Sequence, residues 1–202
     1  MAVSDDDRLM MRLTGLSYRG FWRTGRGDAH VRAIRSGIER GLKEMGLSAW
    51  QIVWGPACFR PPGGWFDDQV IYVMRDPTFK PVRFVIVIRG TNPVTGHSKG
   101  GALAAAFTAW LAETRCDNPH EENWDPHRKA RLRCFTFAAP TPGDRTFADI
   151  LLQRLKNPAE DFRRTWNRCD IVPHAYSFGD LEEISKIYDG PFSNNKQTEV
   201  LT

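Results

Sequence analysis

The sequence lacks the features that mark several large classes of protein. It has no run of about 18 apolar residues, so no segment is predicted to cross a membrane as a helix. It also has no internal repeat and no low-complexity tract. The first seven residues carry three aspartates, Asp5 to Asp7, where a secretory signal would have an apolar core. We therefore expect a cytoplasmic location.

Cysteine is scarce and dispersed. No C-x-x-C pair occurs, which argues against a zinc site and against a dense disulfide framework. We expect buried or partly buried thiols in a reducing compartment, and no metal. The four cysteines are Cys58, Cys116, Cys134 and Cys169.

Charge of one sign is not concentrated enough to indicate a nucleic-acid partner. The formal net charge is +4, the pI is about 9.0, and the basic residues are spread along the chain. Arg128 to Arg133 (RKARLR) is the one local cluster that we single out. We interpret it as a solvated segment leading into a strand, the alternative being a patch for phosphate or an anionic surface. Nucleic-acid binding needs a fuller basic footprint.

The 202 residues, 41% of them hydrophobic and 26% charged, suffice for one globular domain with a sizeable core. Residues 5–48 are predicted to be mostly helical. Five apolar residues recur there at steps of three and four and form one stripe. They are Val31, Ile34, Ile38, Leu42 and Met45.

Strands and helices alternate over the rest of the chain, which favours an α/β fold. The run FVIVI at 84–88 is typical of a strand buried on both faces of a mostly parallel sheet. Helix 99–114 is expected to bury Leu103, Phe107, Trp110 and Leu111. Strands are predicted at 50–53, 69–74, 84–88, 134–138 and 162–167, helices at 99–114, 145–156 and 181–188, a loop at 55–64 and a turn at 75–77.

Residues Gly96 to Gly100 (GHSKG) fit the pattern G-x-S-x-G. In this pattern the serine, here Ser98, lies on a sharp turn between a strand and a helix, and its Oγ is exposed. The backbone N–H of Lys99 would point toward an oxyanion at the helix N-terminus. The small residues that follow, GALAAA at 101–106, allow the helix to pack closely on a sheet. A glycine-rich turn that merely starts a helix is the alternative.

Four segments, in order, resemble the class 3 lipase family of α/β-hydrolases. TGHSKGGALA at 95–104 is similar to the family's nucleophile elbow, and IRGT at 88–91 to the strand end that contributes to the oxyanion hole. FTFAAPTPGDRTFAD at 135–149 resembles the segment after the elbow, and TWNRCDIVPHAY at 165–176 the segment with the acid of the triad. The resemblance implies Thr91 as an oxyanion residue and Asp170 as the acid.

These residues imply a serine mechanism. Ser98 would attack an ester carbonyl, a histidine would take its proton, and Asp170 would orient that histidine. The order Ser, Asp, His along the chain is that of α/β-hydrolases. Asp170 could alternatively cap a turn before Pro173. We assign His97 a structural role and expect the Lys99 side chain on the solvated side of its helix.

Two departures from the family pattern stand out. Six residues separate Thr91 from Ser98, whereas a crossover between parallel strands needs about a dozen or more. We therefore expect a segment to be missing near Pro93 and Val94, the alternative being that the local fold differs. The second departure is the base, because His174 is the one histidine after Asp170. Either His174 is the base, or the catalytic histidine lies beyond Thr202.

We expect one α/β-hydrolase domain over residues 1–202, incomplete, with a mostly parallel sheet flanked by helices, an N-terminal region at 1–80 and a catalytic core at 84–176. The resemblance implies cleavage of carboxylic esters, with lipid esters as substrates, transient contact with a lipid interface, and no cofactor. Two alternatives stay open, an inactive remnant that acts as a binding module and an acyltransferase with the same triad. The oligomeric state is not indicated.

Overall fold

The structure is a computed structural model. It divides into two compact units, which we describe in turn, and the single domain expected from the sequence stays a prediction. One unit is Arg8–Gly100, and the other joins Met1–Asp7 to Gly101–Thr202. The structure describes residues 4–19, 27–59, 69–89, 98–115, 124–125, 127, 129–167, 170, 172–174 and 198–201.

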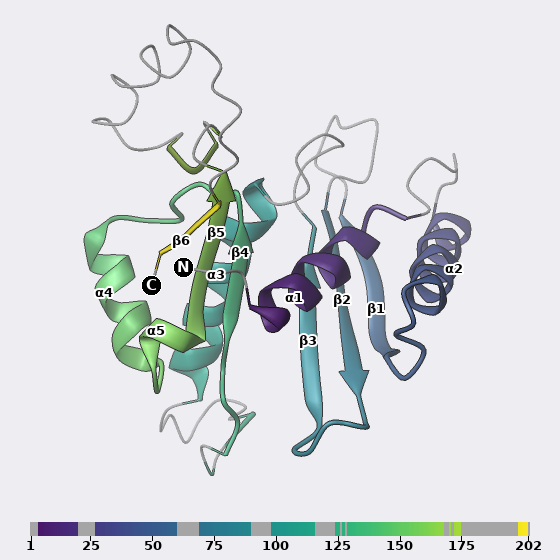
Figure 1. Ribbon diagram of the computed structural model, residues 1–202, viewed down its shortest axis with the longest axis horizontal. Coiled ribbons are helices and arrows are strands. Elements are labelled where there is room, and N and C mark those ends of the chain that lie inside the picture. Colours follow the sequence, from purple (N-terminus) through teal and green to yellow (C-terminus); the bar gives the residue numbers. More distant parts are fainter. Residues whose placement is uncertain are drawn as a thin grey trace, which may run out of the picture. The chain divides into compact units, whose positions relative to one another are not determined.

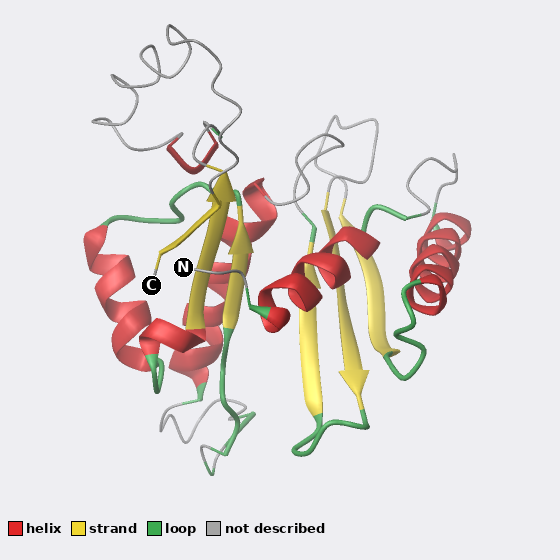
Figure 2. Cartoon of the chain, in the orientation of Figure 1, coloured by secondary structure: helices red, strands yellow, loops and turns green. Residues whose placement is uncertain are grey.

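The unit Arg8–Gly100 pairs two helices with an antiparallel sheet of order β1-β2-β3 (Figures 1 and 2). Its helices are α1 (Asp5–Leu16), which starts in the other unit, and α2 (Asp28–Glu44). The expected apolar stripe of α2 is confirmed, because Ile34, Ile38 and Leu42 are buried. The strands are β1 (Gln51–Phe59), β2 (Gln69–Asp76) and β3 (Arg83–Ile88).

The environment of strand β3 differs from the one that the sequence led us to expect. It pairs antiparallel with β2, and one of its faces is open, with 59% of Phe84 and 38% of Ile86 exposed. The opposite face is buried, and there the Tyr72 hydroxyl of β2 donates to the Leu13 carbonyl of α1 at 3.1 Å. Because Phe84 and Ile86 are exposed, the prediction that 84–88 is buried on both faces was wrong.

Strand β1 is longer than the sequence indicated. It continues through Gly55 and Pro56, which we expected to begin a loop. The register with β2 shifts between Ile52 and Trp54 and again between Trp54 and Ala57, which marks bulges. An edge strand with bulges tolerates proline, and Gly55 takes the φ of 81° that favours glycine. The predicted turn at 75–77 likewise begins later, since β2 runs to Asp76.

The other unit contains a parallel strand pair, β4 (Cys134–Phe137) and β5 (Phe162–Asn167), in register from Cys134 opposite Phe162. The crossover between them holds α4 (Arg145–Arg154) and the short α5 (Pro158–Asp161), as a parallel connection requires. Strand β6 (Thr198–Leu201) pairs antiparallel with β5. The predicted strands at 134–138 and 162–167 and the helix at 145–156 are confirmed, whereas 181–188 lies outside the described residues.

Helix α3 (Ser98–Thr114) is confirmed as a helix, but its buried face is not the predicted one. Trp110 is 55% exposed, and Leu103, Phe107 and Leu111 are only half-buried. The buried positions carry small or polar residues at helical spacing, because only small side chains allow the helix backbone to approach the sheet closely. They are Gly101, Ala105, Thr108 and Ala112.

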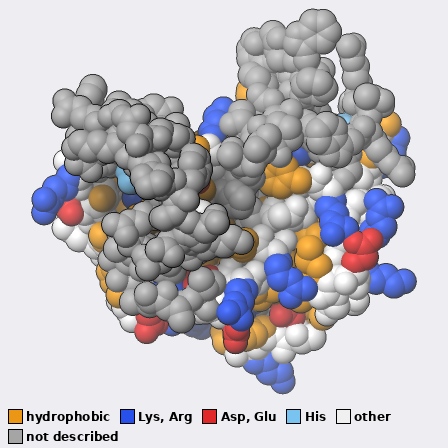
Figure 3. All heavy atoms as spheres, turned by 45° about the horizontal axis from the view of Figure 1, so that its top comes forward, with side chains coloured by type: hydrophobic (Ala, Val, Ile, Leu, Met, Phe, Trp, Pro, Cys, Tyr) orange, Lys and Arg blue, Asp and Glu red, His pale blue; other side chains and the backbone are white. Residues whose placement is uncertain are grey.

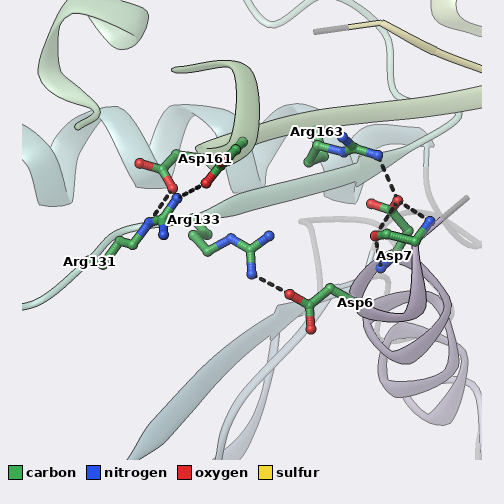
Figure 4. A network of polar contacts seen from close by, with 8 residues as sticks. Asp6, Asp7, Arg131, Arg133, Asp161 and Arg163 are labelled. Atoms are coloured by element: carbon green, nitrogen blue, oxygen red, sulfur yellow. Dashed lines mark hydrogen bonds and ion pairs between the residues drawn. The ribbon is translucent and has the colours of Figure 1, made fainter. Parts of the chain in front are cut away.

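The N-terminus is tied to β5 by a buried ion pair (Figure 4). Arg163 Nη2 donates to Asp7 Oδ2 at 2.8 Å, and the Asp7 side chain is fully buried. Ser4 donates to the same oxygen through its backbone N–H and its hydroxyl. These bonds outweigh the burial that by itself would raise the pKa of Asp7, and they hold that pKa below its usual value of 3.8.

Within the described part of the chain, every helix is too short or too polar to span a bilayer.

Candidate active site

Ser98 lies where the sequence places the nucleophile relative to its helix. It is the first residue of α3, half-buried, and Lys99 beside it is exposed as expected. The free N–H groups of a helix's first turn, and the positive end of its dipole, favour a developing negative charge. The strand half of the predicted elbow, with Thr91 and His97, lies outside the described residues. The role of Ser98 as the nucleophile therefore stays a prediction, which rests on its position at the N-terminus of a helix.

The first turn of α3 packs closely against other residues of the unit that contains most of this helix. A Cβ on Gly101 would lie 2.5 Å from the Ala139 Cβ and 3.3 Å from the Thr136 Cβ. Thr136 belongs to β4, so the first turn of α3 packs directly against the end of this strand. This is the close helix–sheet approach that the run of small residues indicated.

Asp170 follows β5 by three residues and lies two residues before a short 3-10 helix, η1 (Val172–His174). Its backbone N–H donates to the Asn167 carbonyl at 2.9 Å, and its Oδ1 accepts from the Val172 N–H at 3.0 Å. The carboxylate is half-buried. The turn-capping role that we weighed for Asp170 is therefore present, and a second role through its other oxygen is compatible with it.

His174 is the last residue of η1 and is half-buried, directly after the buried Pro173. The structure thus places Asp170 and His174 at the two ends of one short segment. Ser98 belongs to the other compact unit, so its pairing with these two residues stays a prediction.

The buried Cys134 does not compete with Ser98 as a nucleophile. Cys58 and Cys134 form no disulfide, and burial raises the pKa of Cys134 to about 11, partly opposed by a hydrogen bond with Thr108. A thiol reacts as its thiolate, so Cys134 is inert near neutral pH. Among the described residues, no three His, Cys, Asp or Glu side chains gather to hold a metal ion.

The basic cluster near residue 130 is largely engaged inside its own unit (Figure 4). Arg131 pairs with Glu160 and with the buried Asp161, and Arg133 pairs with Asp6. Figure 3 shows Lys and Arg side chains spread over the visible face, with acidic side chains between them. The described arginines of the cluster therefore serve internal ion pairs, which favours the interpretation as a solvated segment over an anion patch.

Comparison with known families identifies the segment that contains these residues. The family model described as Lipase (class 3) matches residues 85–179. The matched residues are therefore similar to the class 3 lipases. The match spans all four segments whose resemblance to the family was noted, and it contains Thr91, Ser98, Asp170 and His174. It supports a carboxylic ester hydrolase of the lipase kind.

A solved structure agrees with the class 3 lipase segment on the fold. The chain is similar to the crystal structure of M37 lipase, with a TM-score of 0.74 and 23% identity. The similarity covers 96% of this chain and 76% of that one. The predicted α/β-hydrolase fold class is thereby confirmed. No curated protein matches the sequence.

Sequence reasoning missed one residue beside the predicted oxyanion segment. Arg89 is 1% exposed, although it lies within the segment IRGT that we used to place Thr91. Its signal in the sequence was a single arginine directly after five apolar residues, to which we assigned no role.

Proposed function

We propose that this chain is a serine hydrolase that cleaves carboxylic esters of lipids through an acyl-enzyme on Ser98. The observation that carries the proposal is the position of Ser98 at the N-terminus of α3, inside the segment that matches the class 3 lipases. The close packing of Gly101 on Ala139 supports it, because it fixes the first turn of the same helix.

In the proposed reaction, Ser98 Oγ attacks the carbonyl carbon of the ester and gives its proton to the imidazole of His174. Asp170 orients the imidazole and stabilises its cation. The Lys99 N–H and Thr91 donate hydrogen bonds to the oxyanion. The imidazolium then protonates the leaving alcohol, and water releases the acid from the acyl-enzyme by the reverse proton path.

Lipid esters are the proposed substrate class because the match is to lipases. We propose transient contact with a lipid interface as part of that activity.

Labelling with a fluorophosphonate probe tests the proposal. We expect the wild type to be labelled and Ser98→Ala to lose labelling completely. Ser36→Ala is the matched control, because Ser36 is an exposed serine of α2 that has no part in the mechanism. It should label like the wild type. A folded wild type that does not react, or labelling that persists in Ser98→Ala, would overturn the assignment.

The same assay decides the base. If His174 is the base, His174→Ala slows labelling by about three orders of magnitude or more, as loss of a triad member does. Undiminished labelling of His174→Ala would assign the base to another histidine. Hydrolysis of short-chain and long-chain p-nitrophenyl esters by the wild type then shows whether a lipid-like acyl chain is preferred.

A further inference from the structure

The carboxyl end of β3 carries a buried cation. Arg89 directly follows the last residue of β3, and its side chain is 1% exposed. Its backbone N–H donates to the Val70 carbonyl at 2.8 Å, which continues the β2–β3 ladder one residue past the strand. A fully buried charge is costly unless polar groups surround it, so this position needs a specific partner.

The C-terminal end of α1 provides such a partner. Arg89 Nη1 donates to the Ser17 carbonyl at 3.2 Å, and Ser17 directly follows the last residue of α1. The guanidinium also lies over the Tyr18 ring, 5.8 Å from its centroid. Carbonyls at the end of a helix carry partial negative charge, and an aromatic face attracts a cation. Arg89 therefore fastens the end of β3 to the end of α1.

A neighbouring contact fastens β2 to the same helix. The Tyr72 hydroxyl donates to the Leu13 carbonyl at 3.1 Å, one helical turn before Ser17. Tyr72 pairs with Val87, two residues before Arg89, so both side chains lie on the helix-covered face of the sheet. Burial raises the pKa of Tyr72, and the charge of Arg89 opposes that rise, which agrees with their being neighbours.

The two contacts differ in their distance along the chain from the proposed oxyanion residue. Tyr72 lies in the middle of β2, whereas Arg89 is two residues before Thr91, the residue that the proposed function places at the oxyanion. Arg89 is the last described residue before Thr91 in the sequence.

We propose that Arg89 is a positioning residue for ester hydrolysis: it anchors the carboxyl end of β3 on the end of α1 and thereby holds the strand end that precedes the oxyanion residue in the sequence. The inference rests on the proposed function. Arginine suits this task better than lysine, because its planar fork offers several donors in fixed directions and stacks on an aromatic ring.

The test compares Arg89→Met, Arg89→Lys and Tyr72→Phe with the wild type. Tyr72→Phe is the matched control, since it removes the other buried hydrogen bond to α1 but none at the end of β3. For each we would measure the melting temperature, kcat and KM on a soluble short-chain p-nitrophenyl ester, and amide hydrogen exchange at position 89.

We expect Arg89→Met to lower kcat by about 10-fold to 100-fold, somewhat less than the loss of an oxyanion donor itself, with KM within about twofold. Arg89→Lys should recover part of kcat, and it carries the test if the methionine variant does not fold. Tyr72→Phe should lower the melting temperature but leave kcat within about twofold. Exchange at position 89 should speed up in the Arg89 variants and not in Tyr72→Phe.

If Arg89→Lys and Tyr72→Phe lose kcat only in proportion to their melting temperatures, Arg89 is structural and the inference is wrong. Unchanged exchange at position 89 in the Arg89 variants would refute the anchoring itself. A folded wild type without esterase activity would instead refute the proposed function and the catalytic part of this inference, while the exchange data still decide the anchoring.

Discussion

Gly101 and Ala139 approach so closely that a Cβ on the glycine would lie 2.5 Å from the Cβ of the alanine. Two non-bonded carbons do not sit at that distance, so any side chain at position 101 must push α3 away from the end of β4. Because Gly101 is three residues after Ser98, such a displacement would move the proposed nucleophile as well.

The first prediction is that Gly101→Ala destabilises the protein by about 1–3 kcal/mol, as overpacking in a filled core does, although alanine is the better helix former. The measurement is the free energy of unfolding in urea. Gly15→Ala is the matched control, because Gly15 lies in α1 and an added Cβ there would have nothing within 4 Å. That variant should gain up to about 1 kcal/mol. Equal effects of the two substitutions would contradict the close packing of Gly101.

The second prediction separates the two roles of Asp170. The amide introduced by Asp170→Asn still offers an oxygen to the Val172 N–H, so this variant should retain the melting temperature within a few degrees. Its kcat should nevertheless fall by about 10⁴, because an amide cannot hold the catalytic histidine in the required tautomer. Asp170→Ala should lose both the cap and the activity. An Asp170→Asn protein with near-normal kcat would leave Asp170 as a turn cap alone.

The third prediction concerns the N-terminal ion pair. Asp7→Asn should lower the free energy of unfolding by about 3 kcal/mol, because it removes the carboxylate that pairs with Arg163, which is only 13% exposed. Asp6→Asn is the control from the adjacent residue. The Asp6–Arg133 pair is about one-third exposed, so its loss should cost less than about 1 kcal/mol. Urea unfolding of both variants at neutral pH measures the difference, and equal losses would contradict it.

The fourth prediction is the pH dependence of that stabilisation. The folded pKa of Asp7 is lowered from 3.8, so the folded state holds its proton less tightly than the unfolded state does. The contribution is therefore complete well above pH 3.8 and is lost as the pH falls below 3.8 through the lowered pKa. The gap in stability between wild type and Asp7→Asn should shrink in that range. A gap that stays constant down to about pH 2 would show that the carboxylate charge is not its source.

Much of the fold followed from periodicity in the sequence. The stripe of Ile34, Ile38 and Leu42 identified the buried face of α2, and residues 162–167 form β5 with the predicted bounds. Helix α2 was predictable because it buries one apolar face, so the spacing of its apolar residues reflects its packing.

The errors arose where close backbone approach or connectivity outweighed hydrophobicity. Helix α3 buries Gly101 and Ala105 and exposes much of Trp110, since a small contact face brings the helix nearer to the sheet. Apolar FVIVI resembled a strand covered on both faces, but antiparallel pairing with β2 left one face open. In the candidate site the position of Ser98 on its helix was predictable, whereas the buried Arg89 was not, because its partner is a backbone carbonyl 72 residues away.

The ion pair between Asp7 and Arg163 also sets an order of events during synthesis, since the two residues are 156 positions apart. The ribosome synthesises Arg8–Gly100 before Gly101–Thr202. The sheet of the first unit can therefore form before Arg163, the partner of Asp7, has been synthesised. The second unit contains both Met1–Asp7 and Gly101–Thr202, so it completes its fold last. In a nascent chain halted before residue 163, the antiparallel sheet would therefore be folded, whereas Met1–Asp7 would be unbound and sensitive to protease.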